Sequence, residues 1–155
     1  MVTSRGILSP VGMRVLELGC GPGANIPFFL SQGADYYAAE GSETIVVELQ
    51  KKFPDKNCHV ACADFTKDFV WEGPFDLIVD RGALTHNNTA DLQKVVEMIR
   101  GSFASNGRFM GMDWFSTRHD ALARDRSNTV DAHTRVFREG YFDGLGNYIF
   151  QMWII

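Results

Sequence analysis

Apolar positions along the chain follow two different periods. Short apolar runs that are typical of buried strands alternate with segments in which apolar residues recur at helical spacing. The expected strands cover residues 13–18, 35–40, 58–63, 75–79 and 108–115, and the expected helices cover 24–32, 43–53 and 89–103. Because strands and helices alternate, we predict an α/β fold with a doubly wound, mostly parallel sheet and helices on both faces.

Capping and turn residues mark the ends of several of these elements. Ser42 stands where an N-cap of the second helix is expected, and Pro54 ends that helix. Asn88 or Thr89 caps the third helix. The pair Asn106-Gly107 is a turn signal, so we expect the fifth strand to begin after it.

The pattern weakens after Trp114. Residues 116–124 are compatible with a capped helix, whereas 125–140 is polar and without period, so we expect a loop over a site or a poorly ordered segment there. The apolar, β-prone tail Tyr148–Ile155 would aggregate as an exposed strand. We therefore expect it to pack on the sheet, to lie in the interface of a homodimer, or to mark a chain that stops early.

Length and composition favour one soluble domain. The 155 residues suit a single domain, with a core over 13–115 and a segment of uncertain structure over 116–155. A net charge of −4 disfavours a nucleic-acid partner. The chain has no apolar signal region and no run long enough to span a bilayer, which predicts a cytoplasmic protein. Of its three cysteines, Cys58 and Cys62 are expected at buried strand positions, and we predict no metal site.

The most informative segment is the glycine turn that follows the first strand. Three glycines at alternate positions, Gly19, Gly21 and Gly23, bring bare backbone N–H groups and a helix N-terminus against a ligand, which indicates a nucleotide-like cofactor. The pattern Gly19-x-Gly21-x-x-Ala24 also satisfies the dinucleotide fingerprint, so an NAD-dependent oxidoreductase remains an alternative. Glu40, at the end of the second strand, can accept two ribose hydroxyls in either class.

Two further positions favour an adenosine-containing ligand bound beside this turn. Asp64 follows the third strand, where its carboxylate can accept the exocyclic amine of adenine, and Phe65 can flank the ring. Glu17 lies inside the first strand, where an acid is costly unless it is paired. At the carboxyl edge of that strand, Glu17 can meet hydrogen-bond donors in the cofactor site.

The segment Val15–Gly23 resembles the first motif of the class I S-adenosylmethionine-dependent methyltransferases. Glu40, Asp64-Phe65 and Phe75–Asp80 fall where that family places its second, third and fourth motifs, and the resemblance extends over Met13–Trp114. The stretch Asp80–Leu84 also looks like the corresponding part of thiopurine-type, small-molecule methyltransferases. The resemblance implies a Rossmann-like fold.

The resemblance also implies a function and a set of site residues. It implies transfer of a methyl group from S-adenosylmethionine to a small-molecule acceptor, with S-adenosylhomocysteine as the product. The implied cofactor-binding residues are Glu17, Gly19, Cys20, Gly21, Gly23, Glu40, Gly41, Asp64, Phe65 and Asp80. Asp80, Arg81 and His86 are the candidate catalytic residues, because they follow the fourth strand toward the acceptor. Asp113-Trp114, at the end of the expected fifth strand, is a further candidate border of the acceptor pocket.

The chain departs from the family pattern at both ends. The family sheet usually has seven strands closed by an antiparallel hairpin, whereas five strands and an apolar tail are evident here, so we expect the hairpin to be missing. About a dozen residues precede the first strand, which leaves an N-terminal lid helix absent or very short. These departures fit a minimal or truncated methyltransferase, and they keep open a non-catalytic S-adenosylmethionine-binding module.

Overall fold

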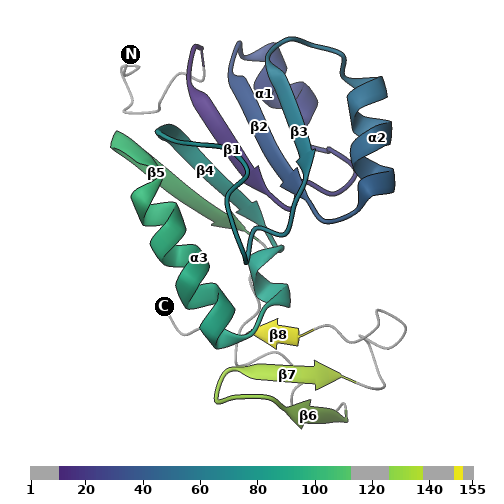
Figure 1. Cartoon of the computed structure of the whole chain (residues 1–155), viewed down its shortest axis with the longest axis vertical. Helices are drawn as coiled ribbons and strands as arrows, with labels where there is room; N and C mark the ends of the chain where they lie inside the picture. The colour runs from purple at the N-terminus through teal and green to yellow at the C-terminus, as the bar shows by residue number, and fades with distance from the viewer. Residues whose placement is uncertain (1–10, 113–125, 138–148, 152–155) are drawn as a thin grey trace.

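A computed structural model describes residues 11–112, 126–137 and 149–151. Its main body is a five-stranded sheet in the order β3-β2-β1-β4-β5 (Figure 1), and every pair of neighbours in it is parallel. The strands are β1 (Arg14–Leu18), β2 (Asp35–Glu40), β3 (Cys58–Cys62), β4 (Phe75–Arg81) and β5 (Phe103–Met112). The connecting helices are α1 (Ile26–Ser31), α2 (Glu43–Lys52), the short 3-10 helix η1 (Leu84–His86) and α3 (Thr89–Gly101). The predicted α/β, doubly wound parallel sheet is confirmed.

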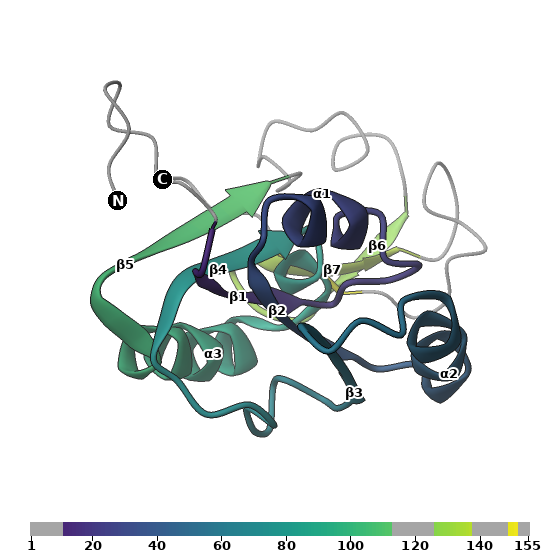
Figure 2. The ribbon, with the colours of Figure 1, turned by 90° about the horizontal axis from the view of Figure 1, so that it is seen from above.

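Helices cover both faces of this sheet, as predicted. Alternate residues of β1 point to opposite faces, so Val15 packs with α1 and α2 while Leu16 packs with α3. Figure 2 shows α1 and α3 on opposite sides of the strands. The connection between β3 and β4 contains no helix, and its Phe65 and Trp71 pack against the cluster on the α3 face.

The capping signals in the sequence act at the positions where they were expected. The Ser42 side chain accepts a hydrogen bond from the Ile45 N–H at 3.4 Å, which caps α2. Of the two candidates for α3, Asn88 is the cap, because its side chain accepts from the Asp91 N–H at 2.9 Å. The expectation that α3 reaches residue 103 is wrong, since the helix ends at Gly101.

Strand β5 begins earlier than the turn signal predicted. It starts at Phe103, and Asn106-Gly107 lies inside it rather than before it. The pairing with β4 is irregular between Phe75 and Leu77, where the extra residues of β5 form a bulge. A Cβ on Gly107 would lie 2.7 Å from the Phe75 carbonyl oxygen, so only glycine fits this bulge. The signal therefore marks an irregularity within a strand and does not end one.

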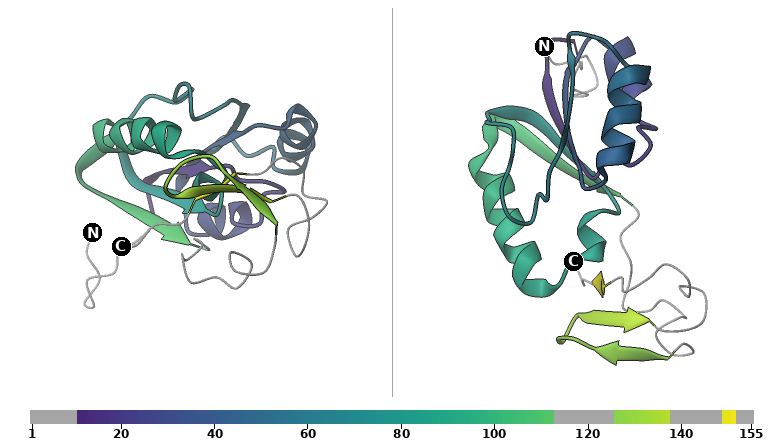
Figure 3. Two further views of the ribbon diagram at one scale, coloured as in Figure 1. Left: turned by 90° about the horizontal axis from the view of Figure 1, so that it is seen from below. Right: turned by 45° about the vertical axis from the view of Figure 1, so that its right-hand side comes forward.

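A second, smaller sheet lies beyond the carboxyl ends of the parallel strands (Figure 3). It contains β6 (Ser127–Thr129), β7 (Thr134–Phe137) and β8 (Ile149–Gln151) in antiparallel order. The expected loop or poorly ordered segment over 125–140 is therefore wrong for the part described. These strands are too short to show a period, which is why the pattern did not reveal them.

Several expectations about the second half of the chain fall outside the described residues. They are the helix over 116–124, the role of Asp113-Trp114, and a homodimer through most of Tyr148–Ile155. The described part of that tail, β8, pairs with β7 and contacts η1. Within the described residues β5 has β4 as its one strand neighbour in the large sheet.

The cysteines occupy less buried positions than expected. Cys58 is half-buried and Cys62 is exposed, because β3 is the edge strand of the large sheet, so the prediction of two buried strand positions is wrong for Cys62. Over the described ranges, no group of histidine, cysteine and acidic side chains is placed to share a metal ion. In the same ranges, no helix has the length and apolar character needed to cross a bilayer.

Candidate active site

The candidate site lies at the carboxyl edge of the large sheet, where the strand order reverses. Leu18 at the end of β1 pairs with Ala39 on one side and with Asp80 on the other, so the segments after β1, β2 and β4 meet. Ligands of open α/β sheets bind at such a switch point. A cavity of about 690 Å³ opens there. It is lined by Gly19, Gly21, Glu40, Gly41, Ala63, Asp64, Phe65, Thr66, Arg81, Gly82, Ala83, His86 and Asn87.

The three glycines of the turn serve three different physical purposes. At Gly19, with φ of 65°, a Cβ would lie 2.4 Å from the Cβ of Ala83, so the turns after β1 and β4 touch. Gly21, with φ of 51°, has no atom within 4 Å of its Cβ position and lines the cavity. Gly23 packs against helix α2, because a Cβ there would lie 2.6 Å from Leu49.

Glu40 joins the glycine turn to the start of α2. Its Oε2 accepts a hydrogen bond from the Gly21 N–H at 2.8 Å, and its Oε1 accepts from the Ser42 N–H at 3.0 Å. A carboxylate has about four acceptor positions, so each oxygen retains capacity toward the cavity that Glu40 and Gly41 line. The acid is therefore oriented by the backbone and still able to accept ligand hydroxyls.

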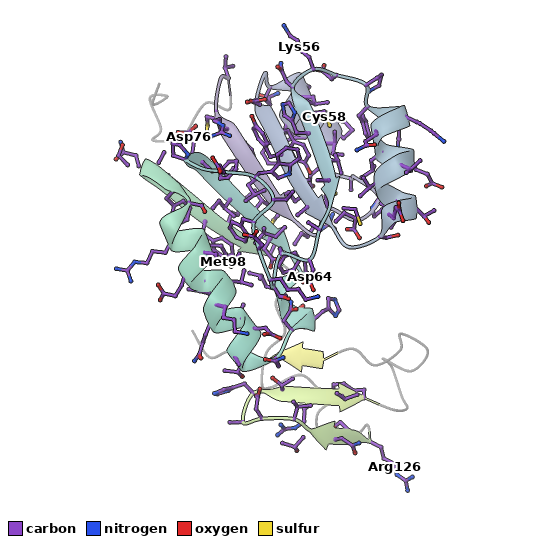
Figure 4. All side chains as sticks on the ribbon, viewed as in Figure 1. Lys56, Cys58, Asp64, Asp76, Met98 and Arg126 are labelled. Carbon is purple, nitrogen blue, oxygen red and sulfur yellow. The ribbon has the colours of Figure 1, made fainter. Side chains whose placement is uncertain are left out.

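Asp64 begins a tight turn and lines the cavity. Figure 4 shows the residue near the carboxyl edge of the sheet. Its Oδ1 accepts from the N–H and the hydroxyl of Thr66, at 3.0 and 2.6 Å, and its Oδ2 forms an ion pair with Lys67 at 3.0 Å. Hydrogen bonds from Thr66 and Lys67 lower the pKa of this carboxyl. Sequence reasoning missed Thr66, although the Asp-x-Thr spacing of such a turn is a readable signal.

Glu17 lies beneath the glycine turn and not in the cavity wall. The residue is 2 % exposed, and its carboxyl accepts hydrogen bonds from the Tyr36 hydroxyl at 2.6 Å and from the Asn25 Nδ2 at 2.8 Å. Burial raises the pKa of this carboxyl. Tyr36 and Asn25 lie on other segments of the chain, so only the tertiary structure shows that they satisfy the acid.

Cys20 is also placed behind the wall. It is buried, and its Sγ donates to the Gly21 carbonyl oxygen at 3.8 Å. Burial raises the pKa of this thiol to about 12, so it remains protonated at neutral pH. Like Gly23, it shapes the turn without lining the cavity.

Asp80 supports the wall of the cavity that follows β4, although its own side chain is buried behind that wall. The residue is fully buried, and its Oδ1 accepts from the N–H groups of Ala83 and Leu84 at 3.0 and 2.9 Å. These bonds hold the turn between β4 and η1, where Gly82 and Ala83 line the cavity. Asp80 itself is not among the lining residues.

Arg81 and His86 share the cavity with Glu40 and Asp64, although they come from the other side of the switch point. Desolvation lowers the pKa of the His86 imidazole, although the residue remains exposed to solvent. Asn87 also lines this part of the cavity, and its Nδ2 donates to the Ala83 carbonyl oxygen at 3.0 Å. Nothing in the sequence singled out Asn87 apart from its place beside His86.

The small sheet is attached to this side of the cavity at two places. Strand β8 contacts η1, which carries His86. Asp131, in the turn between β6 and β7, accepts from the N–H and the hydroxyl of Thr89 at 3.1 and 2.8 Å, at the start of α3. The same carboxylate accepts from the hydroxyl of the buried Thr134 at 2.8 Å.

Residues 15–107 match a protein family described as a methyltransferase domain. The match covers more than half of the chain, and the chain belongs to this family. No curated protein sequence matches the chain. Family and fold together place it among the class I S-adenosylmethionine-dependent methyltransferases. This assignment decides between the two cofactor classes that the glycine turn left open.

Solved structures of methyltransferases share the fold. A S-adenosylmethionine-dependent methyltransferase from Mesorhizobium loti aligns with a TM-score of 0.68 and 19% identity, over 96% of this chain and 71% of its own. The 1,6-didemethyltoxoflavin-N1-methyltransferase of Burkholderia thailandensis, with bound 1,6-didemethyltoxoflavin and S-adenosylhomocysteine, aligns with a TM-score of 0.65 and 18% identity, over 92% of this chain and 55% of its own.

A TehB-like S-adenosylmethionine-dependent methyltransferase from Corynebacterium glutamicum aligns with a TM-score of 0.59 and 23% identity. The alignment covers 65% of this chain and 55% of that one. The chain thus spans little more than half the length of the Corynebacterium and Burkholderia structures.

Proposed function

We propose that this chain binds S-adenosylmethionine in the cavity and transfers its methyl group to a small-molecule acceptor. The observation that carries the proposal is the convergence of the candidate residues on one space. Gly21, Glu40 and Asp64 reach the cavity from β1, β2 and β3, while Arg81 and His86 reach it from β4 and the turn after it. A volume of about 690 Å³ lies within the usual range for small-molecule sites.

The residues on one side of the cavity fit the cofactor. We name the cofactor side by its lining residues Gly19, Gly21, Glu40, Gly41, Ala63, Asp64, Phe65 and Thr66. No protein atom lies within 4 Å of the Cβ position of Gly21. Because glycine has no side chain, this space is free for the methionine part of the ligand. Glu40 supplies carboxylate acceptors for the ribose hydroxyls, and Phe65 with Asp64 supplies an aromatic ring and an acceptor for adenine.

The opposite side fits the acceptor. We name the acceptor side by its lining residues Arg81, Gly82, Ala83, His86 and Asn87. When bound, S-adenosylmethionine supplies an activated methyl group on a sulfonium, so the protein's main task is to align the acceptor with it. The guanidinium of Arg81 offers donors for an anionic or carbonyl group of the acceptor.

His86 is the residue on this side that can take a proton from the acceptor. The lowered pKa leaves its imidazole neutral at pH 7, and a neutral ring nitrogen can accept a proton from a hydroxyl or an ammonium. The rate should therefore fall as the pH drops through the His86 pKa, because protonation removes the base.

Calorimetric titration and an acceptor screen test this proposal. We expect binding of S-adenosylmethionine and S-adenosylhomocysteine without binding of NAD, and labelled methyl transfer to at least one small molecule. His86→Gln should lower kcat while leaving the affinity for S-adenosylmethionine unchanged, with His59→Gln as the matched control, because His59 pairs with Asp35 away from the cavity lining. Binding of NAD alone would refute the proposal, and binding without any transfer would favour a non-catalytic module.

A further inference from the structure

Glu17 is the one ionisable side chain of β1 between Val15 and Leu18, and the three other residues of that stretch are apolar and buried. A buried carboxyl is costly compared with an apolar residue of similar size, even when it is hydrogen-bonded. Its donors, the Tyr36 hydroxyl and the Asn25 amide, are neutral groups. Costly ionisable groups next to a cleft tend to have a functional reason.

Glu17 is connected to both ends of the glycine turn. It stands two residues before Gly19, which lines the cavity, and it binds the side chain of Asn25, which follows the turn. The acid therefore lies at the base of the loop whose outer surface faces the ligand. Protein rather than water fills the space around the carboxyl, so its field is poorly screened.

Other charged and titratable groups surround the same carboxyl. Arg81 and Asp80 approach it from β4, Tyr36 from β2, and Cys20 from the glycine turn. Arg81 favours the ionised form of Glu17 and Asp80 opposes it. Because Tyr36 and Cys20 stay protonated at neutral pH, Glu17 and Asp80 are the two acids of this set. Asp80 accepts hydrogen bonds from two backbone N–H groups of the turn after β4, whereas Glu17 is bound by two neutral side chains beneath the glycine turn.

We propose that Glu17 makes the cofactor site sensitive to ligand charge, so that it favours the sulfonium of S-adenosylmethionine over the neutral thioether of S-adenosylhomocysteine. This inference rests on the proposed function of the cavity. The two ligands share their adenosine, amino and carboxylate groups and differ in the methyl group and the positive charge that goes with it. A buried anion beneath the turn attracts that charge, and the attraction ends when the methyl group has left. Glu17 thereby assists exchange of product for fresh cofactor.

The test compares the affinities of both ligands by calorimetry in the wild type and in Glu17→Gln. We expect Glu17→Gln to reduce the ratio of the two affinities about tenfold, by weakening the binding of S-adenosylmethionine selectively. Glu40→Gln is the matched control, because the ribose is common to both ligands and both should weaken by the same factor. Equal weakening of both ligands by Glu17→Gln overturns the inference.

Wild-type protein supplies a second readout that does not depend on the folding of the variant. The sulfonium favours ionised Glu17, so in the acid pH range where free Glu17 binds a proton, S-adenosylmethionine should release protons on binding, whereas S-adenosylhomocysteine should not. Titrations in two buffers of different ionisation enthalpy measure this release, and the affinity ratio should rise with pH. A ratio that is constant with pH, with no proton release, overturns the inference while leaving the proposed function intact. Binding of neither ligand overturns both.

Discussion

The walls of the cavity and the helix α3 behind its acceptor side are held by hydrogen bonds of different reach along the chain. On the cofactor side, Asp64 binds Thr66 two residues away and Glu40 binds Gly21 nineteen residues away, which is one strand–helix–strand unit. The turn of the acceptor side is likewise held locally, because Asp80 accepts from Ala83 and Leu84 three and four residues away. The start of α3 beside it is different, because there Asp131 accepts from Thr89 across forty-two residues. The comparison teaches that the walls of the cavity are held by hydrogen bonds between neighbouring segments, while the helix behind the acceptor side is also held by a part of the chain that follows much later.

The largest effect on stability is expected at the contact between the turn of the cofactor side and the turn of the acceptor side, where Gly19 meets Ala83. Gly19→Ala would force a Cβ to within 2.4 Å of Ala83 at a positive φ, so both turns must move. We expect a loss of about 3 kcal/mol in the free energy of unfolding, measured by urea denaturation.

Gly21→Ala is the control, since its Cβ meets no protein atom within 4 Å. It should lose only about 1 kcal/mol of stability while strongly weakening cofactor binding. Equal losses of stability would show that the two turns do not constrain each other.

Removing Glu40 should affect the cofactor side alone. Glu40→Ala deletes the acceptor of the Gly21 and Ser42 N–H groups and the proposed ribose ligand. We expect calorimetry to show affinity for S-adenosylmethionine and for S-adenosylhomocysteine weakened by about 1.5–3 kcal/mol. Glu43→Ala, which removes an exposed carboxylate in the first turn of α2, should leave both affinities unchanged. An unaltered affinity in Glu40→Ala would mean that Glu40 does not hold the ribose.

Asp131 provides the corresponding test of the attachment of the small sheet to α3. Asp131→Ala removes the acceptor shared by Thr89, His133 and Thr134, and we expect a loss of about 2 kcal/mol in stability. Amide hydrogen exchange in β6 and β7 should accelerate, while affinity for S-adenosylmethionine should stay within about twofold of the wild-type value. Thr89→Val should reproduce part of this effect and Thr89→Ser should not, because serine keeps the hydroxyl.

The contribution of Asp131 should also depend on pH. Although burial acts to raise it, the pKa of this carboxyl is lowered overall by hydrogen bonds from His133, Thr89 and Thr134. The stabilisation is therefore present above the ordinary carboxyl pKa of about 3.9 and is lost as the pH falls through the lower folded value. A stability difference between wild type and Asp131→Ala that is unchanged at low pH would contradict this account.

Asp64 should give the smallest effect of the set. Its carboxylate is exposed, and exposed ion pairs such as Asp64–Lys67 contribute about 0–1 kcal/mol. Asp64→Asn should weaken binding of S-adenosylmethionine by about 1 kcal/mol or less and leave unfolding by urea unchanged. Lys67→Met breaks the ion pair but keeps the acid, and it should not alter binding. A loss as large as that of Glu40→Ala would make Asp64 a principal ligand residue.

Much of the cofactor side could be predicted from the sequence because its signals are local. Glycines after β1, an acid ending β2 and an acid after β3 must meet once the strands are parallel and adjacent. The placement of Glu17, Cys20, Gly23 and Asp80 behind the wall could not be predicted. Whether a residue next to a turn faces the ligand or supports the turn depends on neighbouring strands, as with Tyr36 and Glu17.

The sequence by itself determined the order of the first five strands and the helices between them, the cap of α2 and the position of the glycine turn, because each rests on residues a few positions apart. Only the tertiary structure decided that Asn106-Gly107 forms a bulge within β5, that residues 127–137 form two strands, and that Asp131 binds Thr89. Those outcomes depend on contacts between segments that are far apart in the sequence. Bringing such segments together costs loop-closure entropy, which the strand pairing and hydrogen bonds between them offset, and no local sequence pattern reveals these contacts.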